Sequence, residues 1–166
     1  MENATAEGAT TSASAQSYVA MVSGMSAETF QDVIASSPRR IRETLFGRLG
    51  IKAKKRGMGI QVHGKQEERT RKLHERLKQG TTKQENELCE ELVRNWLFTK
   101  RPMLKATLDH LGIENDNGLI EQEPTFFQEL EADKVKEMWA ALTESFPPEH
   151  VRVYLQFVKT PHLDKL

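Results

Sequence analysis

The side chains with the clearest chemical use in this sequence are cations in its central third. Lys65, Arg69, Lys72 and Arg76 recur at intervals of four, three and four residues, which on an ideal helix places them in one narrow stripe. Such a stripe could follow a row of phosphates, because neutralising phosphates gives sequence-independent affinity for nucleic acid through counterion release. Eight further cations precede it: Arg39, Arg40, Arg42, Arg48, Lys52, Lys54, Lys55 and Arg56. These twelve residues are the candidate binding site for nucleic acid or for an acidic protein partner.

A helix with these cations is also expected without any phosphate partner. Glu67 and Arg71 lie four residues apart with the acid first, as do Glu68 and Lys72, and this is the favourable order for ion pairs on a helix. Ion pairs of this kind are typical of a solvated helix face. Neither helix-turn-helix spacing nor an RNA-binding signature can be demonstrated in the chain. We therefore favour a solvated face or a protein contact for this stripe, with nucleic-acid binding as the alternative.

Local motifs of enzymes and metal sites are missing from the sequence. It has no His-Glu-x-x-His pattern, glycine-rich phosphate loop, nucleophile elbow or pair of cysteines. No two histidines are three or four residues apart, as ligands on one helix face would be. They are His63, His74, His110, His150 and His162. Asp109 and His110 are adjacent, but neighbouring side chains on a helix point about 100° apart. We expect a protein that is not an enzyme and that has no metal, cofactor or evident small-molecule substrate.

The single cysteine, Cys89, is expected to be structural. It lies beside Leu88 and Leu92 on the apolar side of a helix, where a thiol packs as a small apolar group. Neighbouring glutamates would raise the pKa of its thiol, whereas a nucleophile needs a lowered one. One cysteine cannot form an internal disulfide and is typical of a reducing compartment. With no signal peptide and no apolar run of about 20 residues, this predicts a cytoplasmic protein with no membrane partner.

The formal net charge of zero conceals a strong division along the chain. Residues 39–78 contain fourteen Lys and Arg against four Glu, which gives +10. Residues 84–150 contain fifteen Asp and Glu against six Lys and Arg, which gives −9. Attraction between the two segments, or a separate partner for each, is consistent with this division, because charge bears on association rather than on fold.

Apolar spacing and punctuating residues predict helices over most of the chain. Residues 1–17 contain only Ala, Thr, Ser, Gly and polar residues besides the first Met, and we expect a disordered tail there. Ser26 is a good N-cap for a first helix, and Pro38 begins a second that ends at Gly50. Residues 52–64 lack a period and predict an exposed linker. A polar helix follows from Lys65 to Gln79.

The C-terminal half has the stronger helical pattern. Thr82 and Glu85 have the spacing of a capping box before the clearest amphipathic helix, which ends near Thr99. A further helix follows Pro102 and is closed by Gly112. Residues 125–142 are expected to continue from a second capping box into one helical segment, and a last helix follows Pro148. Each expected helix therefore has a local start or stop signal.

These elements predict an all-α fold: a small multi-helix bundle of about seven helices. The predicted division is a tail at 1–17, a helical pair at 18–51, a basic linker with a polar helix at 52–80, and a helical core domain at 81–166. The expected core residues are Trp96, Leu108, Phe126, Phe127, Trp139 and Tyr154. Whether the helices at 26–50 join this core is left open by the composition.

Two functions are consistent with these features. The first is a non-enzymatic adaptor or regulatory protein whose helical core binds another protein or a second copy of the chain, with complementary charge contributing. The second is a nucleic-acid-binding regulator that uses the basic segment 39–78. They differ in whether this segment is an exposed cationic face or is occupied by contacts within the protein.

Overall fold

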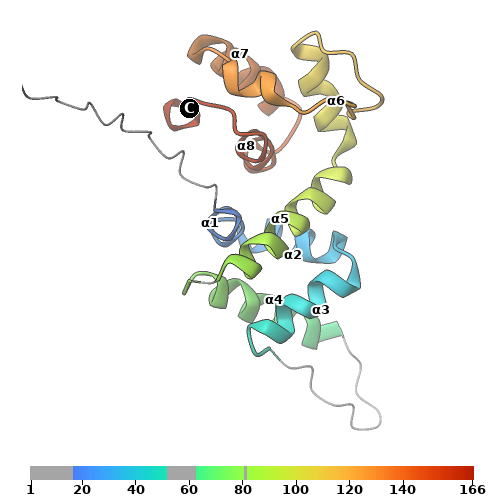
Figure 1. Ribbon diagram of the computed structural model, residues 1–166, viewed down its shortest axis with the longest axis vertical. Coiled ribbons are helices and arrows are strands. Elements are labelled where there is room, and N and C mark those ends of the chain that lie inside the picture. Colours follow the sequence, from blue (N-terminus) through green and yellow to red (C-terminus); the bar gives the residue numbers. More distant parts are fainter. Residues whose placement is uncertain (1–16, 52–62, 81) are drawn as a thin grey trace, which may run out of the picture.

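The computed structural model describes residues 17–51, 63–80 and 82–166, with side chains from residue 66 onward in the second range. The described chain is all-α, as predicted, and contains no strand (Figure 1). Its α-helices are α1 Tyr18–Ser23, α2 Ala27–Ser36, α3 Arg39–Arg48, α4 His63–Leu77, α5 Lys83–Phe98, α6 Arg101–His110, α7 Ala132–Thr143 and α8 Pro148–Phe157. Two 3-10 helices, η1 Thr125–Glu129 and η2 Leu163–Lys165, complete the described elements.

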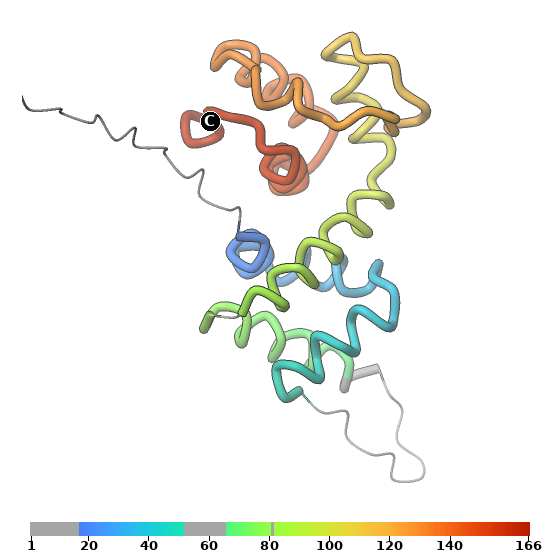
Figure 2. The backbone as a smooth tube through the Cα atoms, viewed as in Figure 1, coloured from blue at the N-terminus to red at the C-terminus, as the bar shows by residue number. Residues whose placement is uncertain are grey.

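The helices form two lobes joined by α5, which runs from one lobe into the other (Figure 2). In the first lobe, α1, α2 and α3 pack against α5, and α4 packs against α1 and α2. The second lobe contains α6, α7 and α8, with α7 in contact with both other helices. The N-terminal helices and the basic helix α4 therefore join the core of α5, which answers the question that composition leaves open.

Apolar side chains from both lobes belong to one buried cluster. In the first lobe Phe30, Phe46, Leu73 and Leu77 are almost wholly buried. The last two form the narrow apolar strip of α4 that its sequence indicates, and they attach this polar helix to the core. Burial of such side chains stabilises the fold by roughly 1.5–3 kcal/mol each.

Four of the six expected core residues are buried, and two are only half-buried. Trp96, Leu108, Phe127 and Tyr154 are buried in the cluster. Phe126 and Trp139 pack against its edge. Trp139 is partly exposed because it lies beside a cleft between the lobes.

Most helix ends have the local chemistry that their sequences indicate. The Ser26 hydroxyl accepts a hydrogen bond from the Thr29 amide at 3.2 Å, and Thr82 with Glu85 forms a complete capping box at the start of α5. After α3 and α6, Gly50 and Gly112 adopt φ of 71° and 69°. These left-handed residues close the helices, as expected of a glycine stop signal.

Two expectations about the elements are wrong. Residues 125–142 do not form one helical segment, because η1 ends at Glu129 and the extended backbone of Leu130 separates it from α7. The short helix α1 is not anticipated by the sequence pattern, although Ser17, assigned to the tail, is its N-cap. Residues 1–16 of the expected tail and residues 52–62 of the expected linker lie outside the described residues.

Candidate functional site

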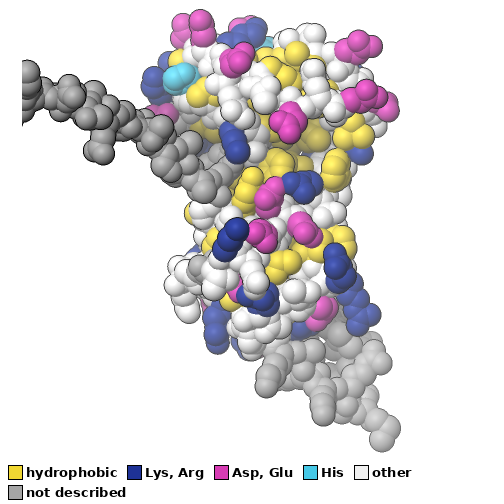
Figure 3. All heavy atoms as spheres, in the orientation of Figure 1, with side chains coloured by type: hydrophobic (Ala, Val, Ile, Leu, Met, Phe, Trp, Pro, Cys, Tyr) yellow, Lys and Arg dark blue, Asp and Glu magenta, His cyan; other side chains and the backbone are white. Residues whose placement is uncertain are grey.

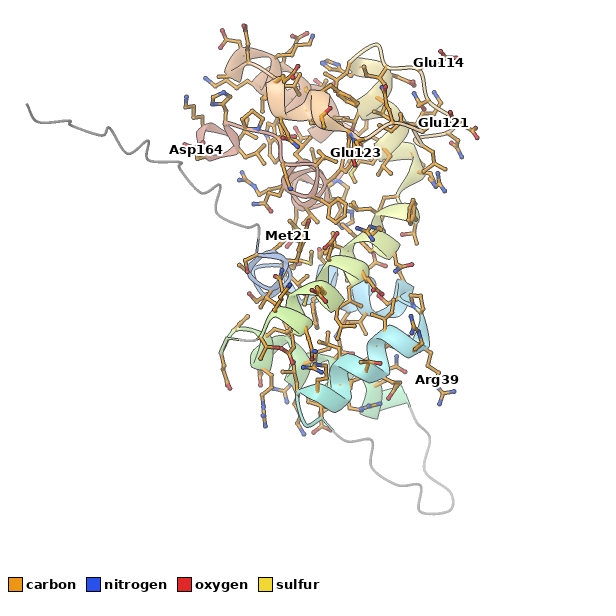
Figure 4. All side chains as sticks on the ribbon, viewed as in Figure 1. Met21, Arg39, Glu114, Glu121, Glu123 and Asp164 are labelled. Atoms are coloured by element: carbon orange, nitrogen blue, oxygen red, sulfur yellow. The ribbon has the colours of Figure 1, made fainter. Side chains whose placement is uncertain are left out.

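A hollow lies between the two lobes of the described chain, where α1 faces α8. It has a volume of about 790 Å³, and Figure 4 labels Met21 on the side of α1 that faces α8. We call it the α1–α8 cleft. Its lining residues are Ser17, Ala20, Met21, Gly24, Met25, Trp139, Pro148, Glu149, Arg152, Val153, Gln156, Thr160 and Leu163. A volume of this size is within the range of protein sites that bind a ligand or a partner's side chains.

The apolar part of the lining comes from distant points of the chain. Met21 and Met25 belong to α1 and the turn after it, and Val153 belongs to α8. Trp139 of α7 and Leu163 of η2 complete it. Flexible methionine side chains adapt to differently shaped partners, which is why they are frequent on surfaces that bind helices. The space-filling view shows apolar side chains at the waist between the lobes (Figure 3).

Arg152 is the only cation among the residues that line the α1–α8 cleft. Its guanidinium carbon lies 5.2 Å from the centre of the Trp139 ring, and its Nη1 donates a long hydrogen bond to the Leu163 carbonyl oxygen at 3.4 Å. It forms no ion pair with any residue that the structure describes. The cleft therefore contains a half-buried positive charge that the described part of the chain does not neutralise.

Glu149, the carboxylate that lines the cleft, accepts hydrogen bonds from residues of the first lobe. Its oxygens accept hydrogen bonds from the Ser26 amide at 2.6 Å, the Ser26 hydroxyl at 2.7 Å and the Thr29 hydroxyl at 2.5 Å. Burial alone would raise the pKa of Glu149, but the bonds from Thr29 and Ser26 outweigh it and hold the pKa below its ordinary value. This contact, which we call the Glu149 clasp, connects α8 with the N-terminus of α2.

A second polar contact lies where α2, α5 and α8 meet. Asp32 accepts hydrogen bonds from Trp96 Nε1 and from Lys100 Nζ, both at 2.7 Å. Burial tends to raise the pKa of Asp32, but these bonds prevail and lower it. His150 packs edge-on against Trp96 with ring centres 5.0 Å apart, and burial together with Lys100 lowers the pKa of His150. Because Asp32 is already engaged by two donors, this contact is suited to holding elements together rather than to proton transfer.

None of the residues of these two contacts or of the cleft belongs to the predicted site. Ser26 is recognisable in the sequence as an N-cap, but its bond to a carboxylate more than a hundred positions away is not a local signal. Arg152 follows the basic segment by a long interval and has no cationic neighbour within six residues on either side. Segmental charge counts therefore cannot find it.

Part of the predicted basic site is occupied by contacts within the first lobe. Arg48 Nε lies 2.9 Å from Glu85 Oε1, and hydrogen bonds from Thr82, together with the Arg48 contact, lower the pKa of the buried Glu85 to about 2. Arg42 Nη1 donates to the Ile34 carbonyl oxygen at 3.4 Å. These two arginines anchor α3 to neighbouring helices.

The stripe on α4 is also partly paired. Arg69 Nη2 lies 3.1 Å from Glu43 Oε2, and its guanidinium carbon lies 4.2 Å from the centre of the Phe46 ring. Lys72 Nζ lies 2.7 Å from Glu68 Oε1, the pair expected from the sequence. Arg69 therefore connects α4 to α3, whereas Lys72 forms an exposed ion pair within α4.

Three predicted cations of the site stay exposed without an ion pair to a described residue. They are Arg39, Arg40 and Arg76. Lys52, Lys54, Lys55 and Arg56 lie outside the described residues, as does the side chain of Lys65. The described members of the predicted site are thus divided into those with contacts within the protein and those that are exposed without an ion pair.

Part of the acidic segment 84–150 lies in the second lobe. Residues 106–133 contain eight Asp and Glu and no Lys or Arg, and all eight acidic side chains are exposed. Figure 4 labels three of them, Glu114, Glu121 and Glu123, at the end of the molecule opposite Arg39. These labelled acidic residues and Arg39 therefore do not neutralise one another within one described chain.

The described cysteine is buried, and the described histidines belong to no metal-binding group. Cys89 is fully buried, and burial, with a smaller effect of Glu85, raises the pKa of its thiol to about 12. His74 stacks on Phe30 with ring centres 4.3 Å apart. Among the described residues, no three His, Cys, Asp or Glu side chains are placed to hold a metal ion.

Within the described residues, no helix has the length and apolarity needed to cross a membrane. Comparison with known proteins finds no matching family model, no matching curated protein and no matching solved structure. The class that the fold and cleft define is an all-α protein of two helical lobes with a mixed apolar and cationic cleft between them.

Proposed function

We propose that this protein is a non-enzymatic adaptor or regulatory protein that binds another protein in the α1–α8 cleft. The observation that carries the proposal is the cleft itself: about 790 Å³ of space between two helical lobes, lined by two methionines and a tryptophan. Grooves between helices with methionine and aromatic linings are a recurring form of protein recognition. The pairing of Arg48 and Arg69 within the first lobe supports a structural role for these two cations of the basic segment.

The proposal is tested by capture of a partner from the cells that make the protein. The tagged chain is compared with Met21→Lys, which places a charge in the apolar cleft, and with Phe98→Lys as a matched control. Phe98 is 46% exposed and does not line the cleft. We expect wild type and the control to recover the same protein partner in stoichiometric amount, and Met21→Lys to recover roughly tenfold less. Recovery of no stoichiometric partner, or equal recovery by both variants, would contradict the proposal.

A second function, nucleic-acid binding, is favoured by one observation. Arg39, Arg40 and Arg76 are exposed and form no ion pair with a described residue, so they are accessible to phosphates. In this case affinity for DNA or RNA should fall linearly with salt on logarithmic axes, and the slope should decrease when Arg39 and Arg40 are changed to Gln. Changing Lys54, Lys55 and Arg56 to Ala provides a second test. Binding without a salt slope, or binding that survives both sets of changes, would exclude this function.

A further inference from the structure

We infer that the α1–α8 cleft recognises an amphipathic helix of a partner protein that carries a carboxylate opposite Arg152. This inference rests on the proposed function and specifies the chemistry of the partner. Three observations carry it. Arg152 lacks a carboxylate partner among the described residues, its guanidinium lies against Trp139 with most N–H donors unused, and the described chain has no sheet edge for an extended partner.

The charge of the cleft favours an acidic partner. Arg152 has no carboxylate partner among the described residues, whereas the carboxylate of Glu149 accepts three hydrogen bonds from Ser26 and Thr29. These neutral donors solvate Glu149 without cancelling its charge, and Arg152 is the charged group of the lining that still lacks strong partners among the described residues. A half-buried cation is stabilised when a carboxylate joins it, because the surrounding apolar groups strengthen the interaction.

The position of Arg152 is suited to binding rather than to solvation alone. Its guanidinium is held near the Trp139 ring and is bonded only weakly to the Leu163 carbonyl oxygen, so most of its N–H donors are left for a ligand. A planar guanidinium with a restricted orientation binds a carboxylate through two parallel hydrogen bonds at a smaller entropic cost than a mobile lysine would. The half-buried side chains of Met21 and Leu163 supply the apolar surface that would accompany this anchor.

The backbone of the partner is expected to be helical. The described chain has no strand, and therefore no described sheet edge to which an extended segment could add. A helix satisfies its own backbone hydrogen bonds and presents side chains at i, i+3 and i+4 to a groove. An acidic residue beside such an apolar row would face Arg152 while the row contacts the half-buried side chains of Met21, Trp139 and Leu163.

The inference is tested with displayed peptides. A helix-biased library of about 16 residues, which is about four helical turns, is selected on the full-length chain and counter-selected on Met21→Lys. Binding of the enriched peptides is then measured by fluorescence anisotropy with wild type, Arg152→Gln and Arg152→Glu. Lys136→Gln, an exposed residue of α7 outside the cleft, is the matched control. Circular dichroism and thermal unfolding show whether each variant keeps its fold.

We expect the enriched peptides to share apolar residues at helical spacing and one Asp or Glu. Affinity should fall by roughly tenfold or more with Arg152→Gln, should fall further with Arg152→Glu, and should not change with Lys136→Gln. Replacing the shared acid of the peptide with Lys should restore binding to Arg152→Glu.

The other outcomes overturn distinct statements. Cleft-dependent peptides that lack the acid, or whose affinity is unaffected by Arg152→Gln, overturn the inference and leave the proposed function standing. Competition of the peptides by a free fatty acid with the same dependence on Arg152 assigns the anchor to a lipid carboxylate and also overturns the inference. Selection that yields no cleft-dependent peptide contradicts both the inference and the proposed function.

Discussion

At the scale of single residues, the acid expected to affect stability most is the buried carboxylate of Glu85, which is held by hydrogen bonds within the protein. Glu85 is 3% exposed and receives hydrogen bonds from Thr82 and Arg48, whereas the eight acidic side chains of residues 106–133 are exposed. An acid held in this way stabilises the folded protein only while it is ionised. The single buried carboxylate of α5 is therefore more informative about stability than the eight exposed acids of residues 106–133.

Glu85 should make the stability of the protein depend on pH in the acid range. Its pKa is lowered to about 2 in the folded chain from an ordinary value of 4.5, first by the hydrogen bond from Thr82. Because the folded pKa is the lower one, the contribution of Glu85 is present above about pH 4.5 and is lost as pH falls toward about 2. Glu85→Gln should reduce the free energy of unfolding by about 1 kcal/mol near neutral pH, and by much less near pH 2, about where Glu85 becomes protonated in the folded chain.

The measurement is urea unfolding followed by circular dichroism across this pH range. Glu87→Gln is the matched control, since Glu87 is on the same helix and is 61% exposed at its side chain. A difference between Glu85→Gln and wild type that is the same at both ends of the pH range would show that the carboxylate charge is not the cause.

At the scale of elements, the helices whose ends have local chemistry are the ones that the sequence predicts. Ser26, the Thr82–Glu85 capping box and Gly112 act within one or two helical turns, so their effect is visible in the sequence. The helix α1 also has a local N-cap in Ser17, but its six residues are held mainly by burial of Val19 and Val22 and by a hydrogen bond from the Val19 amide to Asn86 Oδ1 at 3.1 Å. Such a short helix depends on tertiary contacts, which no local pattern records.

The turn at Gly118, after α6, packs closely against that helix, and a substitution can test what this contact contributes to stability. Gly118 has φ of 84°, and a Cβ added there would lie 2.9 Å from the Arg101 carbonyl oxygen and from Leu104 Cβ. Gly118→Ala should therefore lose about 1 kcal/mol for the positive φ and a further 1–3 kcal/mol for the overlap. Gly112→Ala is the matched control, because Gly112 has φ of 69° but no atom within 4 Å of the added Cβ.

The measurement for this pair is the midpoint of thermal unfolding. We expect Gly118→Ala to lower it clearly more than Gly112→Ala does. Equal midpoints would mean that the turn can move away from α6 without cost, and the contact between Gly118 and α6 would then have no energetic role.

At the scale of the whole molecule, the two lobes and the cleft between them are what the sequence could not predict. The cleft combines Met21 with Arg152, and the Glu149 clasp combines Ser26 with Glu149. These pairs come from opposite ends of the chain, and each partner alone has an ordinary local explanation as a core residue, a surface cation or a helix cap. The charge counts located the basic segment correctly, but they could not show that Arg48 and Arg69 form ion pairs within the first lobe. Only the exposed cations of the segment are available to bind a nucleic acid.

The Glu149 clasp should control how firmly the second lobe is held on the first. Glu149 accepts three hydrogen bonds from the N-terminus of α2, and it also lines the α1–α8 cleft, so loss of the clasp should loosen α8 and widen the cleft. Glu149→Ala should cost about 1–3 kcal/mol, because hydrogen bonds to a charged group are stronger than neutral ones. Hydrogen exchange measured by mass spectrometry should show faster exchange at the start of α2 and in α8, by roughly tenfold for each 1.4 kcal/mol of local stability lost.

The control for this prediction is Glu144→Ala. Glu144 is exposed at the end of α7 and forms no ion pair with a described residue, so this change should leave exchange in α2 and α8 unchanged. Protection that is identical in Glu149→Ala and wild type would mean that α5 and the apolar contact of Tyr18 with Phe157, at 5.8 Å between ring centres, hold the lobes together without the clasp.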